Sequence, residues 1–541
     1  MSSLREEDPS TAVLRHRSGW WGTGGIFAVS VCLLACIAFV MLARDFWDYT
    51  LDDAYISFRY ARNLIEGNGL VFNAGEYPRS EGITSPLWGF VLSVGIAANI
   101  DPLLWAKWLG VVGLFTAAAI VGVTVFKAIS GATTLSVGAS RGFAIVAAAS
   151  LIVSPYMVVN SLSGMETTLA VAVYAVFLLS TMWTVELGTR RSVAVVTGVC
   201  AVAVPMLRPE MALAVAVTLV SAFVLWRPSR VNVAVSIVTF AGIGIAYFFI
   251  RYAYYGLPLP LPFYIKQGKS GFPGWADVAE FVKYAAPLGL LSAVTVCFAA
   301  YAIARKRANP AVAALLAISV GAVAQVGYYA TIHHIMGFGF RYFMPVLVAF
   351  TITGTVGIGM LCARITTRTG LRAAVVAAFG AALLVPNALA LSPTEKLVSG
   401  YNEGKLIDIA TSMRNAGVGS FSLAMNDCGA IPYVTRSRVL DLAGLNERNI
   451  ALLGTREVAV QEISRARPDL ILLVASRVND PSSVLGWENL SDEDMRSLGY
   501  QFAGTIELSP EYNYLVYANP LAGADLVLER MQVDGTMTAR A

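Results

Sequence analysis

The sequence carries little charge for its length. Of its 541 residues, 14% are Asp, Glu, Lys or Arg and 56% are hydrophobic, whereas a soluble globular protein has about 25% charged residues. The mean hydropathy of +0.64 agrees with this bias. The composition therefore excludes an ordinary soluble protein and predicts a polytopic α-helical membrane protein.

Histidine and cysteine are also scarce, with three and six residues respectively. Five of the cysteines fall in apolar runs, only Cys428 lies in the polar C-terminal part, and no CxxC or Cys/His metal pattern occurs. This distribution excludes a disulfide framework and a zinc site from that part. The polar part also lacks a phosphate loop, a dinucleotide-binding fingerprint and a nucleophile elbow. Its sequence therefore points away from nucleotide-dependent and serine-hydrolase chemistry.

What the sequence does contain is ten apolar runs, from which we predict eleven membrane spans; a spanning helix takes about 17–25 residues. The run 192–226 is interrupted by Arg208, Pro209 and Glu210. Because a charged pair beside a proline is costly at mid-bilayer, we count this run as two short spans. The first apolar run, 24–43, is not followed by a signal-cleavage site and is expected to remain as a membrane helix. The predicted spans outside 192–226 are 24–43, 108–126, 142–159, 167–185, 231–250, 285–304, 310–332, 343–362 and 371–391.

The segment 86–98 is apolar but has only ~13 residues, the length of an interfacial or re-entrant helix. If it stays outside and the N-terminus is cytoplasmic, the basic loop clusters at Lys127, Arg190, Arg227, Arg305 and Arg364 all lie inside, as the positive-inside rule requires. The sequence thus predicts a multi-pass protein of the cell membrane. Its N-terminus is expected in the cytoplasm and its C-terminal domain outside the cytoplasm.

From Glu395 onward the hydropathy falls, and this part holds 13 basic and 19 acidic residues. Short apolar runs alternate with helix-like segments, and a Ser-Pro-Glu turn separates the apolar runs 502–508 and 513–518. This alternation predicts a small α/β domain. We therefore expect a transmembrane domain at 1–394, with its first outer loop at 44–107, and an extracytoplasmic domain at 395–541.

The most unusual stretch is 51–88, LDDAYISFRYARNLIEGNGLVFNAGEYPRSEGITSPLW, which follows the first span. It opens with adjacent carboxylates, Asp52 and Asp53, which repel each other and cost stability. The simplest structural role for one of them is to cap the helix that follows. That role leaves the other free to react, so we expect this loop to carry the chemistry.

The predicted topology brings acidic, basic and imidazole groups to the outer face. A polyprenyl-phosphate sugar needs cations for its phosphate and membrane helices for its tail. Its transfer also needs a carboxylate to deprotonate an acceptor hydroxyl or to stabilise an oxocarbenium-like centre. The candidate catalytic residues are Asp52 and Asp53; the candidate donor-binding residues are Arg59, Lys266, Lys269, His333, His334 and Arg341; and the candidate supporting or acceptor-binding residues are Glu81, Glu166, Arg208, Glu210 and Asp427.

Several of these residues have plain structural alternatives. Glu166 could only begin the next helix, and Arg208 could only pair with Glu210. Lys266 and Lys269 could reach lipid headgroups instead. The sequence implies no certain cofactor, although a divalent cation could bind between Asp52, Asp53 and phosphate oxygens.

The motifs of this loop resemble those of the polyprenyl-phosphate-dependent glycosyltransferases of the GT-C fold. The shared features are the opening Asp-Asp, the RNL-GNG-VFN-GE pattern, EGITSPLW, and the GME and RPE turns. They are most similar to the AftB group of mycobacterial terminal arabinofuranosyltransferases. The resemblance implies that the first-loop aspartate, Asp52 or Asp53, is catalytic.

The resemblance implies transfer of a sugar, D-arabinofuranose, from a polyprenyl phosphate to a cell-envelope glycan acceptor at the outer face. A second expectation keeps the fold and takes polyprenyl-phosphate mannose as donor. A third is a lipid-linked glycan transporter without bond chemistry. The expected partners are the lipid donor, the glycan acceptor and membrane lipid, without nucleic acid.

Overall fold

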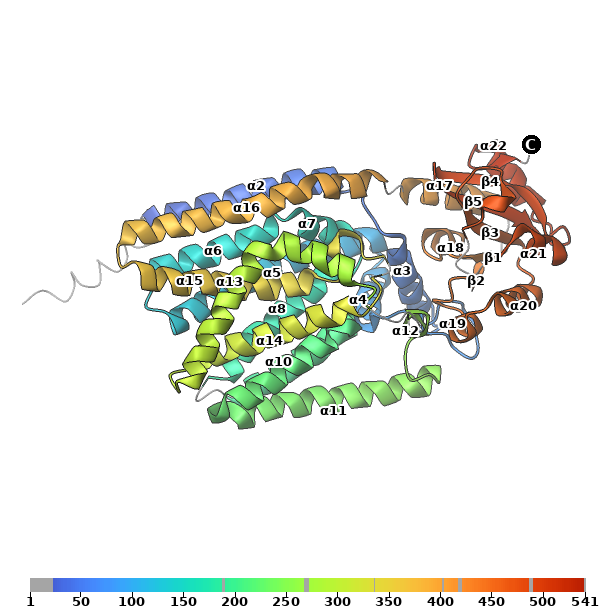
Figure 1. The fold of residues 1–541 in the computed structure, drawn as a ribbon. Helices are drawn as coiled ribbons and strands as arrows, with labels where there is room; N and C mark the ends of the chain where they lie inside the picture. Colours follow the sequence, from blue (N-terminus) through green and yellow to red (C-terminus); the bar gives the residue numbers. More distant parts are fainter. Residues whose placement is uncertain are drawn as a thin grey trace, which may run out of the picture.

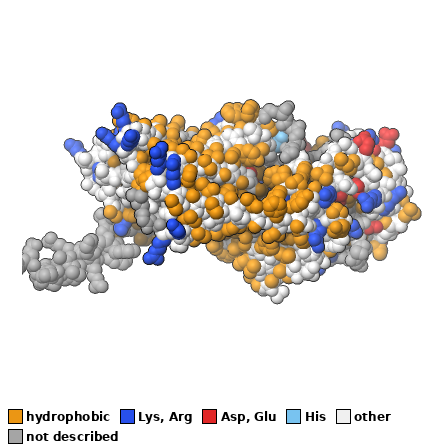
Figure 2. Space-filling model, turned by 90° about the horizontal axis from the view of Figure 1, so that it is seen from below, with side chains coloured by type: hydrophobic (Ala, Val, Ile, Leu, Met, Phe, Trp, Pro, Cys, Tyr) orange, Lys and Arg blue, Asp and Glu red, His pale blue; other side chains and the backbone are white. Residues whose placement is uncertain are grey.

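The computed structural model describes residues 23–186, 190–266, 272–334, 336–400, 403–416, 421–485 and 490–539. Long helices lie side by side in a bundle, and a smaller domain of helices and strands lies at one end (Figure 1). Helix α3 (Asp52–Ile65) lies between the bundle and this domain. The surface of the bundle is largely apolar, as expected for a protein in contact with lipid tails (Figure 2).

Within these ranges, eight helices are long and apolar enough to cross a membrane, and a pair bent by 54° would form a ninth span. The eight are α2 (Thr23–Phe46), α5 (Pro102–Ala132), α8 (Thr167–Thr184), α11 (Arg230–Tyr255), α13 (Trp275–Ala304), α14 (Pro310–Ala330), α15 (Met344–Ile365) and α16 (Thr369–Gly400), and the bent pair is α6 (Val137–Ile152) with α7 (Pro155–Leu162). The apolar run 192–226, which we predicted to form two spans, forms two shorter helices, α9 (Arg191–Leu207) and α10 (Ala212–Leu225). Each predicted span therefore coincides with a helix or a helix pair.

The break between α9 and α10 follows from the Arg-Pro-Glu sequence. Proline lacks an N–H and disfavours helical geometry in the residue before it. Accordingly, Arg208 is extended, with φ −142° and ψ 94°, and the 3-10 helix η2 (Pro209–Met211) follows it. The side chain of Arg208 is buried at this break.

The predicted interfacial segment forms the twelve-residue helix α4 (Pro86–Ala97), which packs against α3. Short helices and turns complete the end of the bundle near the C-terminal domain. They are α12 (Leu261–Lys266) and η4 (Phe338–Phe340), while η3 (Arg227–Ser229) lies between α10 and α11.

The C-terminal domain has a six-stranded sheet in the order β2-β1-β3-β5-β4-β6. β1 pairs in parallel with β2 and β3, whereas the β3–β5, β4–β5 and β4–β6 pairs are antiparallel. The strands are β1 (Ser422–Met425), β2 (Arg438–Asp441), β3 (Leu470–Ala475), β4 (Gln501–Ser509), β5 (Tyr512–Ala518) and β6 (Thr538–Ala539). The helices are α17 (Glu403–Asn415), α18 (Ala430–Thr435), α19 (Arg448–Leu453), α20 (Arg456–Ala466), α21 (Asp492–Ser497) and α22 (Asp525–Val533), with η5 (Pro481–Ser483).

All six residues of β3 are buried, as expected for a central strand. The predicted small α/β domain is therefore present. The predicted boundary at 394/395 lies within α16, which continues to Gly400.

Candidate functional site

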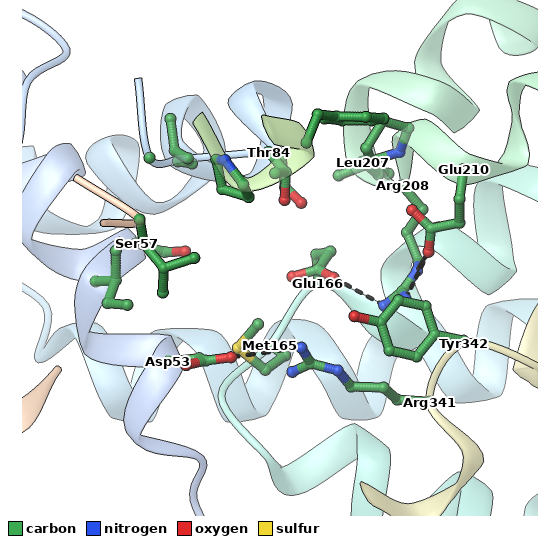
Figure 3. A pocket seen from close by; sticks show the side chains of 18 of the residues that line it. Asp53, Ser57, Thr84, Met165, Glu166, Leu207, Arg208, Glu210, Arg341 and Tyr342 are labelled. Carbon is green, nitrogen blue, oxygen red and sulfur yellow. Dashed lines mark hydrogen bonds and ion pairs between the residues drawn. The ribbon is translucent and has the colours of Figure 1, made fainter. Parts of the chain in front are cut away.

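A cavity of about 240 Å³ lies at the end of the bundle that faces the C-terminal domain. Its walls come from the start of α3, the loop 82–85, the start of α8, the α9–η2 break, α12, and the segments on either side of η4. Figure 3 shows polar side chains from several of these elements directed toward one space. The predicted site residues that line it are Asp53, Glu166, Arg208, Glu210, His333 and Arg341.

Arg208 is held between two carboxylates in this cavity. Its Nη1 lies 3.0 Å from Glu166 Oε1, and its Nη2 lies 2.6 Å from Glu210 Oε1. The guanidinium also lies over the ring of Tyr342, 4.7 Å from its centroid. The pairing of Arg208 with Glu210 that the sequence allowed is thus formed, and Glu166 joins it. The three side chains together carry one net negative charge.

Arg341 has a different environment. Its Nη2 lies 3.4 Å from Asp53 Oδ2, and its side chain is 8% exposed. Within the described part of the chain, its Nε and Nη1 have no hydrogen-bond partner. A buried donor without a partner is costly. Arg341 therefore presents N–H groups without a partner in the described protein, beside a carboxylate and at the wall of the cavity.

The two adjacent aspartates face different parts of the molecule. Asp53 lines the cavity and its side chain is 24% exposed. Asp52 is buried and accepts hydrogen bonds from the backbone N–H groups of Gly429 (3.0 Å) and Ala430 (2.7 Å). A Cβ at position 429 would lie 2.1 Å from Asp52 O, so this close approach requires glycine. Neither aspartate is the N-cap of α3, because that position is Leu51.

Burial raises the pKa of Asp52 to about 8, and the nearby Asp427 adds to this effect, although the two N–H donors oppose it. Asp52 is engaged with the start of α18, whereas Asp53 faces the cavity. No group of three or more potential metal ligands was found in the described ranges.

Arg59 connects α3 to the C-terminal domain and does not line the cavity. It donates to Phe72 O (2.7 Å), Pro432 O (2.9 Å), Ser437 O (2.7 Å) and Asn73 Oδ1 (3.0 Å). Its burial lowers the pKa of the guanidinium to about 10, with Arg62 adding to the shift. All these acceptors are protein groups, so Arg59 is part of the domain interface.

Three further candidates also lie outside the cavity lining. Glu81 pairs with Arg251, with Oε2 2.7 Å from Nη2, and burial raises the pKa of Glu81 to about 7. His334 Nδ1 lies 2.8 Å from Asp277 Oδ2. Asp427 accepts hydrogen bonds from the hydroxyls of Tyr512 and Tyr514.

The two lysines are not placed against the cavity. Lys266 is the last residue of α12, and its side chain lies outside the described residues. Lys269 lies outside them entirely. Their predicted contact with a donor remains a prediction.

The C-terminal domain reaches the cavity through Leu445. The next residue, Asn446, accepts a hydrogen bond from the Tyr60 hydroxyl (3.0 Å), which in turn accepts one from the N–H of Gly82 (2.7 Å). Asn446 Nδ2 donates to Asp441 Oδ2 at 2.8 Å. These contacts fix the cavity loop 82–85 to the domain. No local sequence pattern links residue 60 to residue 446, so this connection could not be predicted from the sequence.

Solved structures similar to this chain support its fold. ArnT from Cupriavidus metallidurans bound to undecaprenyl phosphate has a TM-score of 0.57 at 13% identity, covering 92% of this chain and 98% of that one. The Archaeoglobus fulgidus oligosaccharyltransferase tethered with an acceptor peptide has a TM-score of 0.56 at 13% identity, covering 92% of this chain and 74% of that one. A family model described as a domain of unknown function (DUF8728) matches residues 406–518. No curated protein matches the sequence.

At this identity the likeness concerns the fold alone. The chain is a polytopic membrane protein with the GT-C fold and a small C-terminal α/β domain. The predicted fold is confirmed. Its assignment to the arabinofuranosyltransferase group stays a prediction.

Proposed function

We propose that this protein is a membrane glycosyltransferase that moves a sugar from a polyprenyl-phosphate donor to a glycan acceptor. The observation that carries this proposal is the pairing of Asp53 with Arg341, whose Nε and Nη1 have no partner in the described protein. A buried guanidinium with unused donors fits phosphate oxygens, which accept charge-assisted hydrogen bonds. Asp53 supplies a carboxylate beside that position.

In the proposed reaction, an acceptor hydroxyl attacks the anomeric carbon while the bond from that carbon to the phosphate oxygen breaks. Asp53 takes the hydroxyl proton, and the polyprenyl phosphate leaves with the bonding electron pair. Arg341 stabilises the negative charge that develops on the phosphate. The acids around Arg208 lie on the same cavity and are suited to bind sugar hydroxyls.

The donor class is supported by the neighbours of the same fold. One of them was solved with undecaprenyl phosphate, and the Archaeoglobus fulgidus oligosaccharyltransferase AglB, with a TM-score of 0.54, was solved with a dolichol-phosphate. From the motif resemblance we further propose that the sugar is D-arabinofuranose and the acceptor a cell-envelope glycan. Mannose is the alternative sugar.

We also propose the predicted orientation, with the cavity at the outer face. Lys and Arg side chains gather at the end of the bundle away from the C-terminal domain, whereas that domain shows acidic and basic side chains together (Figure 2). This distribution follows the positive-inside rule if the C-terminal domain is outside.

The test is a transfer assay with purified protein in lipid nanodiscs. The donors are synthetic polyprenyl-phosphate arabinofuranose, polyprenyl-phosphate mannose and a third sugar as control. We expect turnover with the arabinose donor, abolished by Asp53→Asn and retained by Asp45→Asn, an exposed aspartate on α2. Turnover with mannose alone would reject the proposed sugar. Absence of turnover with every donor, or full activity of Asp53→Asn, would reject the proposed mechanism.

A further inference from the structure

A second hollow lies on the other side of the first turns of α3. It has a volume of about 660 Å³ and is open to the surface, and we call it the aromatic–acidic groove. The membrane part contributes residues from the end of α2 through α3 and from the start of α5, while the C-terminal domain contributes α17 and α18. None of its residues lines the cavity that holds Asp53. The proposed function therefore does not account for it.

The charge of this groove excludes an anionic ligand. Asp48, Asp101 and Asp408 line it and are all exposed. Lys107 is the single cationic residue of the lining, and its ammonium donates to the backbone carbonyls of Trp47 and Tyr49 within the wall. The accessible charge is thus negative. A phosphate or carboxylate would be repelled, whereas hydroxyl groups could donate hydrogen bonds to the carboxylates.

Four aromatic side chains, Trp47, Tyr55, Phe58 and Tyr433, also line the groove, together with aliphatic residues. The rings of Tyr55 and Tyr433 have centroids 5.6 Å apart, and Phe58 lies 6.0 Å from Tyr433. Trp47 is 37% exposed at the end of α2. Aromatic faces next to carboxylates suit a ligand with an apolar C–H face and a rim of hydroxyls. A sugar ring has both.

Thr50 supplies an independent indication of a ligand. It lines the groove and is fully buried, and within the described residues its Oγ1 has no hydrogen-bond partner. A buried hydroxyl normally has a partner. Thr50 lies two residues before the start of α3 and three residues before Asp53, which lines the cavity. Thr50, Tyr55 and Phe58 line the groove, while Asp53, Ile56 and Ser57 line the cavity.

From this arrangement we infer that the aromatic–acidic groove binds an uncharged glycan, and that this glycan is the acceptor of the proposed transfer. The second clause rests on the proposed function, whereas glycan binding by the groove does not. The acceptor would then lie in the groove with one part of its chain and reach Asp53 at the cavity with its reacting hydroxyl, while the lipid phosphate is kept away from the acidic groove.

The test measures glycan binding without turnover. Wild-type protein and the Asp53→Asn variant, each in nanodiscs, are titrated with a neutral arabinofuranosyl oligosaccharide, a neutral mannose oligosaccharide and a sulfated oligosaccharide, and binding is followed by saturation-transfer difference NMR. We expect a neutral glycan to bind both proteins equally and the sulfated one not to bind. The double variant Asp48→Asn/Asp408→Asn should weaken neutral binding at least 10-fold, and Trp47→Ala should weaken it as well. Glu457→Gln, an exposed acid on α20, is the matched control.

The outcomes separate the two proposals. If no neutral glycan binds, if the groove variants bind it as the wild type does, or if the sulfated glycan binds more tightly, the groove proposal is overturned. Binding that depends on the groove, together with full transfer activity in Asp53→Asn, supports the groove and rejects the proposed mechanism. In an active enzyme, the groove variants should raise the acceptor KM and leave the donor KM unchanged.

Discussion

Asp and Arg side chains on the two sides of helix α3 differ in how many of their hydrogen-bonding groups have protein partners. On the side of the C-terminal domain, Asp52 and Arg59 are buried and hydrogen-bonded to protein groups. On the cavity side, Asp53 has only a 3.4 Å contact to Arg341, which keeps two N–H groups unused in the described protein. Buried polar groups are normally satisfied. Asp52 and Arg59 therefore hold the C-terminal domain against α3, whereas the N–H groups of Arg341 support the proposed donor site.

The largest expected effect separates the two neighbouring aspartates. Asp53→Asn should reduce kcat by about 10²–10⁴-fold, the usual range for loss of a general base, with little change in Tm. Asp52→Asn should retain most of the activity and lower Tm, because the Asp52 carboxyl group accepts two hydrogen bonds at the start of α18. Single-turnover transfer and thermal unfolding of both variants check this comparison. Inactivation by Asp52→Asn at unchanged Tm would reverse the assignment.

Arg341 provides the next contrast. Arg341→Lys keeps a positive charge but removes the forked donors, and kcat should fall by about 10²–10³-fold, as for loss of a group that stabilises developing charge. The matched control is Arg251→Lys, because Arg251 is also buried beside a carboxylate but is paired with Glu81 away from the cavity. Equal kcat losses in the two variants would show that burial, and not the free N–H groups, accounts for the effect.

A substitution at Arg59 tests the contact between α3 and the C-terminal domain. Arg59→Met removes the donor from three backbone carbonyls and from Asn73, and should destabilise domain docking by about 2–3 kcal/mol. Arg62→Met is the control, since Arg62 is less buried and donates to Tyr433 O. Limited proteolysis should release the C-terminal domain faster from the Arg59 variant than from the control. Equal rates would contradict the interface role of Arg59.

The protonation of Asp52 provides a second test of the contact between α3 and the C-terminal domain. Its pKa in the folded protein is raised to about 8, so the folded state binds a proton that the unfolded state releases near pH 4. This contribution to stability is present at low pH and is lost as the pH rises through about 8. Between pH 5 and pH 9, Tm should therefore fall by on the order of a few °C more in the wild type than in Asp52→Asn. Parallel Tm profiles of the two proteins would exclude this linkage.

The smallest effect is expected where the interface reaches the cavity. Tyr60→Phe removes the hydroxyl that joins Gly82 to Asn446. The loop 82–85 should become less well positioned, and kcat/KM should fall by about 5–10-fold, which corresponds to about 1 kcal/mol. Tyr255→Phe is a useful control, since that hydroxyl donates to Leu70 O outside the cavity lining. If Tyr60→Phe lowers kcat/KM no more than Tyr255→Phe does, the Tyr60 hydroxyl does not position the loop 82–85.

The sequence identified candidate site residues by their chemical type, but it did not identify the residues with which they form hydrogen bonds or ion pairs. Six of its candidates line one cavity although they are up to 288 residues apart. Arg59 and Asp52 belong to the same loop but contact residues near 430, and Glu81 is paired with Arg251. Such long-range pairs have no local signal. Arg251 and Thr50 were missed for this reason.

The sequence by itself determined that this is a membrane protein, where its helices break, and that its C-terminal part is a small α/β domain. Those properties follow from hydropathy, proline and the alternation of polar and apolar residues, which act over a few residues. Only the tertiary structure distinguishes the surroundings of Asp52 from those of Asp53. Adjacent side chains on a helix point about 100° apart, so one meets the C-terminal domain and the other meets Arg341. The identity of those neighbours depends on how distant segments pack around α3.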